Sequence, residues 1–78
     1  MRGIQVKLKE LLEERQVTRG YVARMVQTRF EVIDRWYEGS LERIDLDVLA
    51  RICRVLSCEV QDILEVAKER EEETDGGR

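Results

Sequence analysis

Apolar residues recur at helical spacing along most of this chain. Leu8, Leu11 and Leu12 stand three and four positions apart with charged residues around them, a pattern that predicts an amphipathic helix over about residues 6–15. The same periodicity predicts four further helices, over about residues 18–25, 29–37, 46–56 and 60–67. The chain is rich in Leu, Val, Ile, Arg and Glu and has no proline, which favours short helices over a sheet. We therefore expect an all-α fold of five short helices.

Capping and terminating residues stand at the ends of three of these helices. Thr18 and Asp45 precede the second and fourth predicted helices, and their side-chain oxygens are typical N-caps. Gly39 follows the third predicted helix and is expected to end it, because glycine readily adopts the left-handed backbone found at helix C-termini. The expected core positions are Leu8, Leu11, Leu12, Val22, Ala23, Met25, Val26, Ile33, Trp36, Leu46, Leu49, Ile52, Cys53, Leu56, Val60, Ile63 and Leu64.

The third predicted helix lies within the segment VQTRFEVIDRWYEG, residues 26–39. At about 100° per residue, Ile33 points to the core while Glu31 and Arg35 project outward. Phe30 lies at the margin of the core side, so it is either partly buried beside Ile33 or exposed on the outer face. The exposed charges either bind a partner or are simply solvated, with Glu31 paired to Arg35 one turn away.

Length and hydropathy limit the class of protein. At 78 residues, the chain is near the lower limit for a domain with an unaided core. It holds no run of about 18 apolar residues, so we expect no transmembrane helix and no membrane partner. The first residues, MRGIQ, lack the apolar core of a secretion signal. A cytoplasmic location is therefore expected.

Charge is unevenly distributed along the chain. The segment EVAKEREEETDGGR, residues 65–78, accounts for the whole net charge of −3, so residues 1–64 carry equal numbers of cations and acids. We expect residues 68–78 to form a charged flexible tail that solubilises the chain. The neutral remainder counts against nucleic-acid binding, because phosphate contacts usually require a basic surface.

Catalytic chemistry finds little support in the residue types. The chain has no histidine, no glycine-rich phosphate loop and no spacing that would join a nucleophile to a base. Cys53 and Cys58 are five positions apart, without the CxxC spacing or histidine partners of a metal site. They are expected to be buried structural thiols, although a regulatory disulfide remains open. We expect neither an enzyme nor a cofactor.

Five short helices with this spacing resemble the lambda-repressor/Cro-like (XRE-type) helix-turn-helix family. The resemblance rests on KLKELLEERQVTRGYVARMV, IDRWYEG and IDLDVLARICRVLSCEVQDILE, and covers about residues 5–66. It implies a compact five-helix lambda-repressor-like domain over residues 1–66, followed by the disordered acidic tail. It also implies that the third helix reads DNA in the major groove.

The family pattern implies a role for each exposed position of that helix. Its first two positions and one a turn later read bases, which here are Phe30, Glu31 and Arg35. The fork of Arg35 fits guanine O6 and N7, Glu31 can accept from a cytosine amino group, and Phe30 can contact a thymine methyl.

Phosphate contacts are implied at four further positions. Arg19, directly after the helix cap, takes the place of a glutamine that often binds phosphate in the family. The remaining candidates for backbone contacts are Arg24, Arg29 and Arg43.

The chain departs from the family pattern at three supporting positions. Gln27 stands where glycine is usual, so a left-handed backbone there would be strained. Arg29 replaces the usual serine or threonine cap, although Thr28 could cap one residue earlier. Glu38 replaces an asparagine that often binds phosphate.

Two functions are therefore compatible with the sequence. The first is a sequence-specific transcriptional regulator that binds double-stranded DNA, expected to be a repressor that dimerises through the fourth and fifth helices. The second is a repurposed scaffold that binds another protein, such as an anti-repressor, an antitoxin-like partner or a phage-encoded inhibitor. It would use acidic residues of the third-helix face, Glu31, Glu38 and Glu42, with exposed Phe30, Val32 and Leu41.

Overall fold

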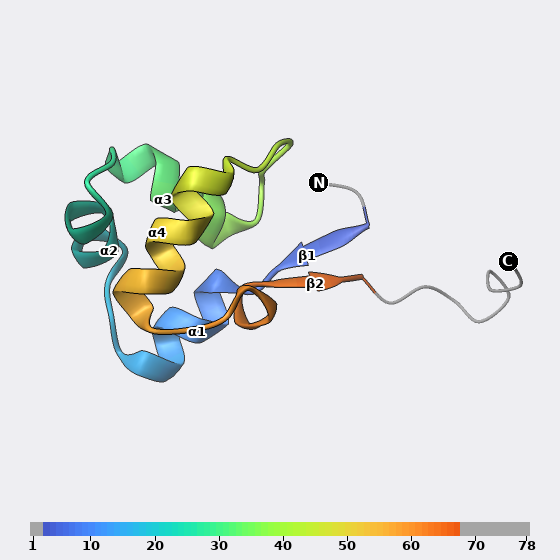
Figure 1. The fold of residues 1–78 in the computed structure, drawn as a ribbon, viewed down its shortest axis with the longest axis horizontal. Coiled ribbons are helices and arrows are strands. Elements are labelled where there is room, and N and C mark those ends of the chain that lie inside the picture. The colour runs from blue at the N-terminus through green and yellow to red at the C-terminus, as the bar shows by residue number, and fades with distance from the viewer. Residues whose placement is uncertain (1–2, 68–78) are drawn as a thin grey trace, which may run out of the picture.

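Four α-helices, a short 3₁₀ helix and two short strands make up residues 3–67, the part of the chain that the computed structural model describes (Figure 1). In chain order they are β1 (Ile4–Val6), α1 (Leu8–Arg15), α2 (Arg19–Val26), α3 (Phe30–Glu38), α4 (Leu46–Leu56), η1 (Val60–Asp62) and β2 (Leu64–Val66). The strands lie side by side at one end of the molecule (Figure 1). The expected tail, residues 68–78, lies outside the described residues.

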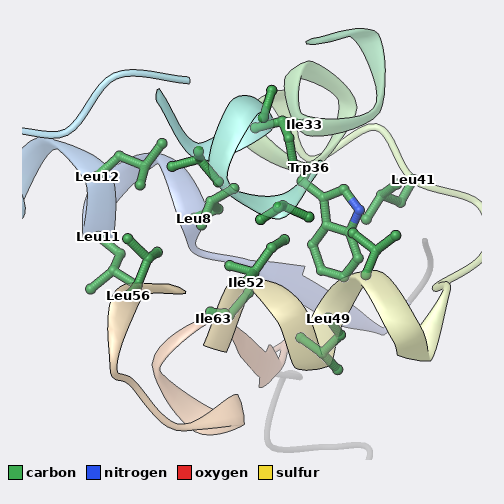
Figure 2. Packing of buried hydrophobic residues seen from close by; sticks show 14 residues of the cluster. Leu8, Leu11, Leu12, Ile33, Trp36, Leu41, Leu49, Ile52, Leu56 and Ile63 are labelled. Atoms are coloured by element: carbon green, nitrogen blue, oxygen red, sulfur yellow. The ribbon is translucent and has the colours of Figure 1, made fainter. Parts of the chain in front are cut away.

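The core is formed by the apolar stripes of the four helices together with one residue from each of two connecting segments. Trp36 is 2% exposed and Ile52 is fully buried, so α3 and α4 each contribute a large side chain to the interior. Figure 2 shows side chains of α1, α3 and α4 converging on this interior with Leu41 and Ile63. Burial of an aliphatic or aromatic side chain of this size contributes about 1.5–3 kcal/mol. This common core holds α3 in place with its other side toward solvent.

Helix ends follow the expected local chemistry. The Thr18 hydroxyl accepts from the Tyr21 amide at 3.0 Å, and an Asp45 carboxylate oxygen accepts from the Asp47 amide at 2.9 Å. Gly39 ends α3 with φ of 76°. These caps satisfy backbone groups that have no partner within their own helix.

Residues 60–67 do not form the expected helix, and the mostly helical fold carries a small two-stranded sheet in addition. Here η1 makes a single tight turn, and β2 then pairs antiparallel with β1, with Leu64 opposite Val6 and Val66 opposite Ile4. A short apolar run fits a strand as well as a helix, and periodicity alone cannot separate them. The partner strand decides the conformation. Because β1 includes Val6, the first helix begins at Leu8 instead of residue 6.

Three expected core positions are exposed, and one residue expected at the surface is buried. Leu46 is 73% exposed, Met25 50% and Val60 49%, whereas Leu41 is only 8% exposed. Leu46 lies about 100° around α4 from the centre of its buried stripe, so it cannot reach the interior. Leu41 follows Gly39 and closes the core after α3 (Figure 2).

Among residues 3–67, no helix has the length and apolar character needed to cross a membrane.

Candidate nucleic-acid interface

A tight turn at residues 27–29 joins α2 to α3 (Figure 1). Gln27 adopts the left-handed conformation, with φ of 67°, and the Thr28 amide donates to the Ala23 carbonyl at 3.0 Å. This confirms that a non-glycine residue occupies a strained backbone position in the turn. Ala23 is 5% exposed, so a small side chain is buried on the α2 surface beside this turn.

The start of α3 lacks a side-chain cap. Arg29 occupies the N-cap position with extended backbone and makes no capping hydrogen bond through its side chain. The Val32 amide instead donates to the Arg29 carbonyl at 3.0 Å. Thr28 therefore does not cap the helix one residue early, and α3 begins at Phe30.

The outer face of α3 presents all three expected base-reading residues to solvent. Glu31 and Arg35 are exposed, and Phe30 is 47% exposed. Ile33 and Trp36, on the opposite side, are buried. The structure therefore resolves the open question of Phe30 in favour of exposure, and all three residues lie on a helix fixed by the core beneath it.

Arg19, the first residue of α2, lies against α3. Its Nη1 atom is 2.5 Å from Asp34 Oδ1 and 4.0 Å from Glu38 Oε2. Its guanidinium carbon lies 4.4 Å from the centre of the Tyr37 ring and 5.6 Å from that of Phe30. We call these five residues the Arg19 cluster. Both carboxylates and both rings belong to α3, so Arg19 ties the start of α2 to the length of α3.

Sequence reasoning missed this cluster. Arg19 and Asp34 are 15 positions apart, and no helical spacing rule connects residues on different helices. The sequence offers only one weak indication of it. Asp34, Tyr37 and Glu38 are spaced so that they share one face of the third helix, where a single cation can contact all three.

The other candidate phosphate-binding arginines carry no ion pair with any residue of the described range. Arg24, Arg29 and Arg43 are exposed, and the ion pairs within residues 3–67 involve Lys7, Arg19 and Arg51. The pairing of Glu31 with Arg35 is likewise not among them. Positive charge on these side chains is therefore available to a ligand.

An open hollow of about 530 Å³ lies where α3 passes into the following loop. It is lined by Arg35, Ser40, Leu41, Glu42 and Arg43. Two guanidinium groups and a hydroxyl thus line a space next to α3, together with the Glu42 carboxylate, which opposes an anion. The guanidinium and hydroxyl groups are donors suited to phosphate oxygens.

The two cysteines lie close together at the end of α4. Both are free and half-buried, and the Cys58 amide donates to the Cys53 carbonyl at 3.0 Å. Burial, together with the neighbouring Cys53 thiol, raises the pKa of the Cys58 thiol to about 11. A thiol that stays protonated at neutral pH is a weak nucleophile, so the local chemistry is that of structural thiols.

A turn-linked helix pair, packed on a helical core with the second helix open on its outer side, defines the helix-turn-helix class of DNA-binding domain. The chain belongs to the Cro/C1-type helix-turn-helix DNA-binding domains, whose family model matches residues 7–69. This is a family of DNA-binding domains and not of enzymes.

Two solved structures share the fold. A candidate DNA-binding protein from Bacteroides fragilis superposes with a TM-score of 0.70 at 21% identity, over 80% of this chain and 98% of the other. The transcriptional regulator VanUg superposes with a TM-score of 0.67 at 29% identity, over 88% of this chain and 93% of the other. None of the curated proteins matches the chain.

Proposed function

We propose that this protein is a sequence-specific transcriptional regulator that inserts α3 into the major groove of DNA. The observation that carries the proposal is the outer face of α3, where Phe30, Glu31 and Arg35 are exposed while the opposite side of the helix is anchored by buried Trp36. A helix held in this way can present side chains to base edges without losing its position.

The three exposed residues supply different kinds of base contact. Arg35 forms no ion pair within the described chain, so its guanidinium is free to donate to guanine O6 and N7. Glu31 offers an acceptor for a cytosine amino group. Phe30 offers an apolar contact for a thymine methyl group.

Backbone contacts would come from arginines around that face. Arg24 and Arg29 stand near the turn, and Arg43 lines the hollow beside Arg35. A DNA phosphate entering this hollow would meet Arg43 and the Ser40 hydroxyl, with the Glu42 carboxylate opposing it. Arg19 would be the fourth contact, although its charge is already engaged by Asp34.

The proposed regulator is a homodimeric repressor, with the dimer surface on α4 and the segment that follows it. The expected fifth helix is replaced by η1 and β2, so the surface is redefined by Leu46, Val60 and Val66, which are 73%, 49% and 71% exposed. A dimer that covered these side chains would remove their apolar surface from water. A two-fold dimer would place two α3 helices in successive major grooves. A cytoplasmic location belongs to the same proposal.

A titration of fluorescent duplex DNA, followed by anisotropy, tests this function. At 50 mM salt, mixed-sequence duplex should bind with a Kd of about 10⁻⁴–10⁻⁶ M and weaken steeply as salt rises. Selection from a random pool should then yield a preferred sequence that binds more tightly. Absence of any binding at 50 mM salt would overturn the proposal.

One observation supports the second function, an interaction module for another protein. Phe30 is half exposed, and the exposed carboxylates of Glu31 and Glu38 lie on the same helix. Exposed aromatic side chains are common in protein interfaces. Buried Leu41 and half-buried Val32 reduce the apolar surface that this function requires. The DNA titration separates the two functions, since the interaction module needs no salt-dependent affinity for duplex.

A further inference from the structure

The Arg19 cluster places one cation against two carboxylates. Asp34 Oδ1 lies 2.5 Å from the guanidinium and Glu38 Oε2 lies 4.0 Å from it. The Tyr37 ring lies 4.4 Å from the guanidinium carbon. The ionic groups of the cluster therefore sum to a negative charge, although its central residue is a candidate phosphate contact.

These groups remain accessible to a ligand. The side chains of Arg19, Asp34 and Glu38 are 38%, 37% and 61% exposed. An ion pair at this level of exposure is weak in water and can exchange partners. A DNA phosphate that approached Arg19 would compete with Asp34 for the same N–H donors and would also meet the Glu38 charge.

We propose that Asp34, assisted by Glu38, weakens phosphate-driven DNA binding by holding Arg19 on α3. This inference rests on the proposed DNA-binding function. Non-specific affinity comes almost entirely from phosphate contacts, whereas specific affinity also includes base contacts. Loss of one phosphate contact therefore lowers the affinity for every duplex by a similar factor, so Asp34 sets the affinity for DNA of any sequence.

The opposite role for Asp34 makes an opposite prediction. If Asp34 oriented Arg19 toward a phosphate, removing the carboxylate would weaken binding. If Asp34 competes with phosphate, removing it strengthens binding. The net negative charge of the cluster favours competition, because a residue that merely oriented Arg19 would not require the second carboxylate of Glu38.

The experiment compares Asp34→Asn with Glu13→Gln on mixed-sequence duplex between 50 and 200 mM salt, a range in which phosphate contacts dominate affinity. Glu13 is an exposed α1 residue without an ion pair in the described chain, so its variant matches the change in net charge. Asp34→Asn should bind about two- to fivefold more tightly than Glu13→Gln, the range that a surface ion pair allows. Glu38→Gln should act in the same direction with a smaller effect.

A double-mutant cycle ties the effect to Arg19. In an Arg19→Ala background, Asp34→Asn should give no more tightening than Glu13→Gln does. Circular dichroism and melting temperature confirm that each variant is folded, and Glu38→Gln carries the comparison should Asp34→Asn unfold.

The outcomes separate the two levels of the proposal. If the wild type binds duplex but Asp34→Asn binds no more tightly than Glu13→Gln, the competing role of Asp34 alone is overturned. Persistence of the Asp34→Asn gain without Arg19 also overturns it. Failure of the wild type and all variants to bind duplex at 50 mM salt overturns the DNA-binding function itself.

Discussion

The Arg51 guanidinium donates a hydrogen bond to the Val26 carbonyl at 3.1 Å and so joins α4 to the last turn of α2. The Val26 carbonyl lies at a helix C-terminus, where backbone acceptors lack partners within the helix. Asp47, one turn earlier on α4, holds Arg51 at 2.9 Å. Arg15 makes an equivalent bond to the Leu56 carbonyl at the end of α4. Arg51 and Arg15 therefore donate to backbone carbonyls at the C-terminal ends of helices, in addition to being partly solvent-exposed.

Loss of the Arg51 contact should destabilise the fold. We expect Arg51→Ala to lower the free energy of unfolding by about 1–2 kcal/mol, because a charged donor to a backbone carbonyl is lost. Arg54→Ala is the matched control, since Arg54 is exposed on the same helix and has no ion pair within residues 3–67. Urea unfolding measures both variants, and equal effects would show that the Val26 contact contributes nothing.

Leu46 and Leu49 are the same residue type on the same helix, so alanine substitutions at the two positions test which side of α4 faces the core. Leu49 is 6% exposed and Leu46 is 73% exposed. Leu49→Ala should therefore cost about 2–5 kcal/mol of stability, whereas Leu46→Ala should change it by about 0.5 kcal/mol or less. Denaturant unfolding at low protein concentration is the measurement. A large loss for Leu46→Ala that grows with protein concentration would indicate instead that Leu46 is buried in a dimer.

Backbone strain at Gln27 should be relieved by glycine. Gln27 and Gly39 both have positive φ, at 67° and 76°. We expect Gln27→Gly to stabilise the domain by about 0.5–1 kcal/mol and Gly39→Ala to destabilise it by a similar amount. A Cβ at Gly39 would meet no atom within 4 Å, so its effect isolates the backbone term. Melting curves that shift in the same direction for both variants would contradict this account.

Arg35 and Arg24 should affect DNA binding in different ways. Arg35→Ala should lose about 1–3 kcal/mol on a selected preferred duplex and little on unrelated duplexes, because it removes a base contact. Arg24→Ala should weaken all duplexes alike and reduce the salt slope by about one ion. Competition anisotropy with preferred and scrambled duplexes distinguishes them. Equal losses on both duplexes for Arg35→Ala would reassign Arg35 to phosphate binding in the adjacent hollow.

The raised pKa of Cys58 predicts a loss of stability in alkali. Burial and the Cys53 thiol raise the pKa of Cys58 from 9.0 to about 11 in the folded protein. Between these values the unfolded chain releases the proton while the folded chain retains it, so unfolding becomes more favourable as pH rises. No such contribution exists below about pH 8, where both states are protonated.

The measurement is the free energy of unfolding between pH 8 and 11 for the wild type and Cys58→Ala. The wild type should lose more stability over this range than the variant, because other alkaline titrations are common to both. Parallel pH profiles would show that the Cys58 thiol ionises equally in the folded and unfolded chains.

Local sequence determined the helices and much of the exposed face of α3. The spacing of Leu8, Leu11 and Leu12, the caps at Thr18 and Asp45, and the terminator at Gly39 act within a turn or two of chain. Their effects can therefore be derived without knowing the rest of the fold. The outward direction of Glu31 and Arg35 follows from the same periodicity.

Only the tertiary structure decided the features that join distant segments. Pairing of Ile4 with Val66 turned the end of the domain into a strand. Closure after α3 buried Leu41, and the approach of α2 to α3 placed Arg19 on Asp34. Each depends on residues brought together by chain folding, so periodicity, which describes only near neighbours, contains no information about them. What the sequence presented as a free phosphate contact is, in the folded protein, a cation already held by Asp34 of α3.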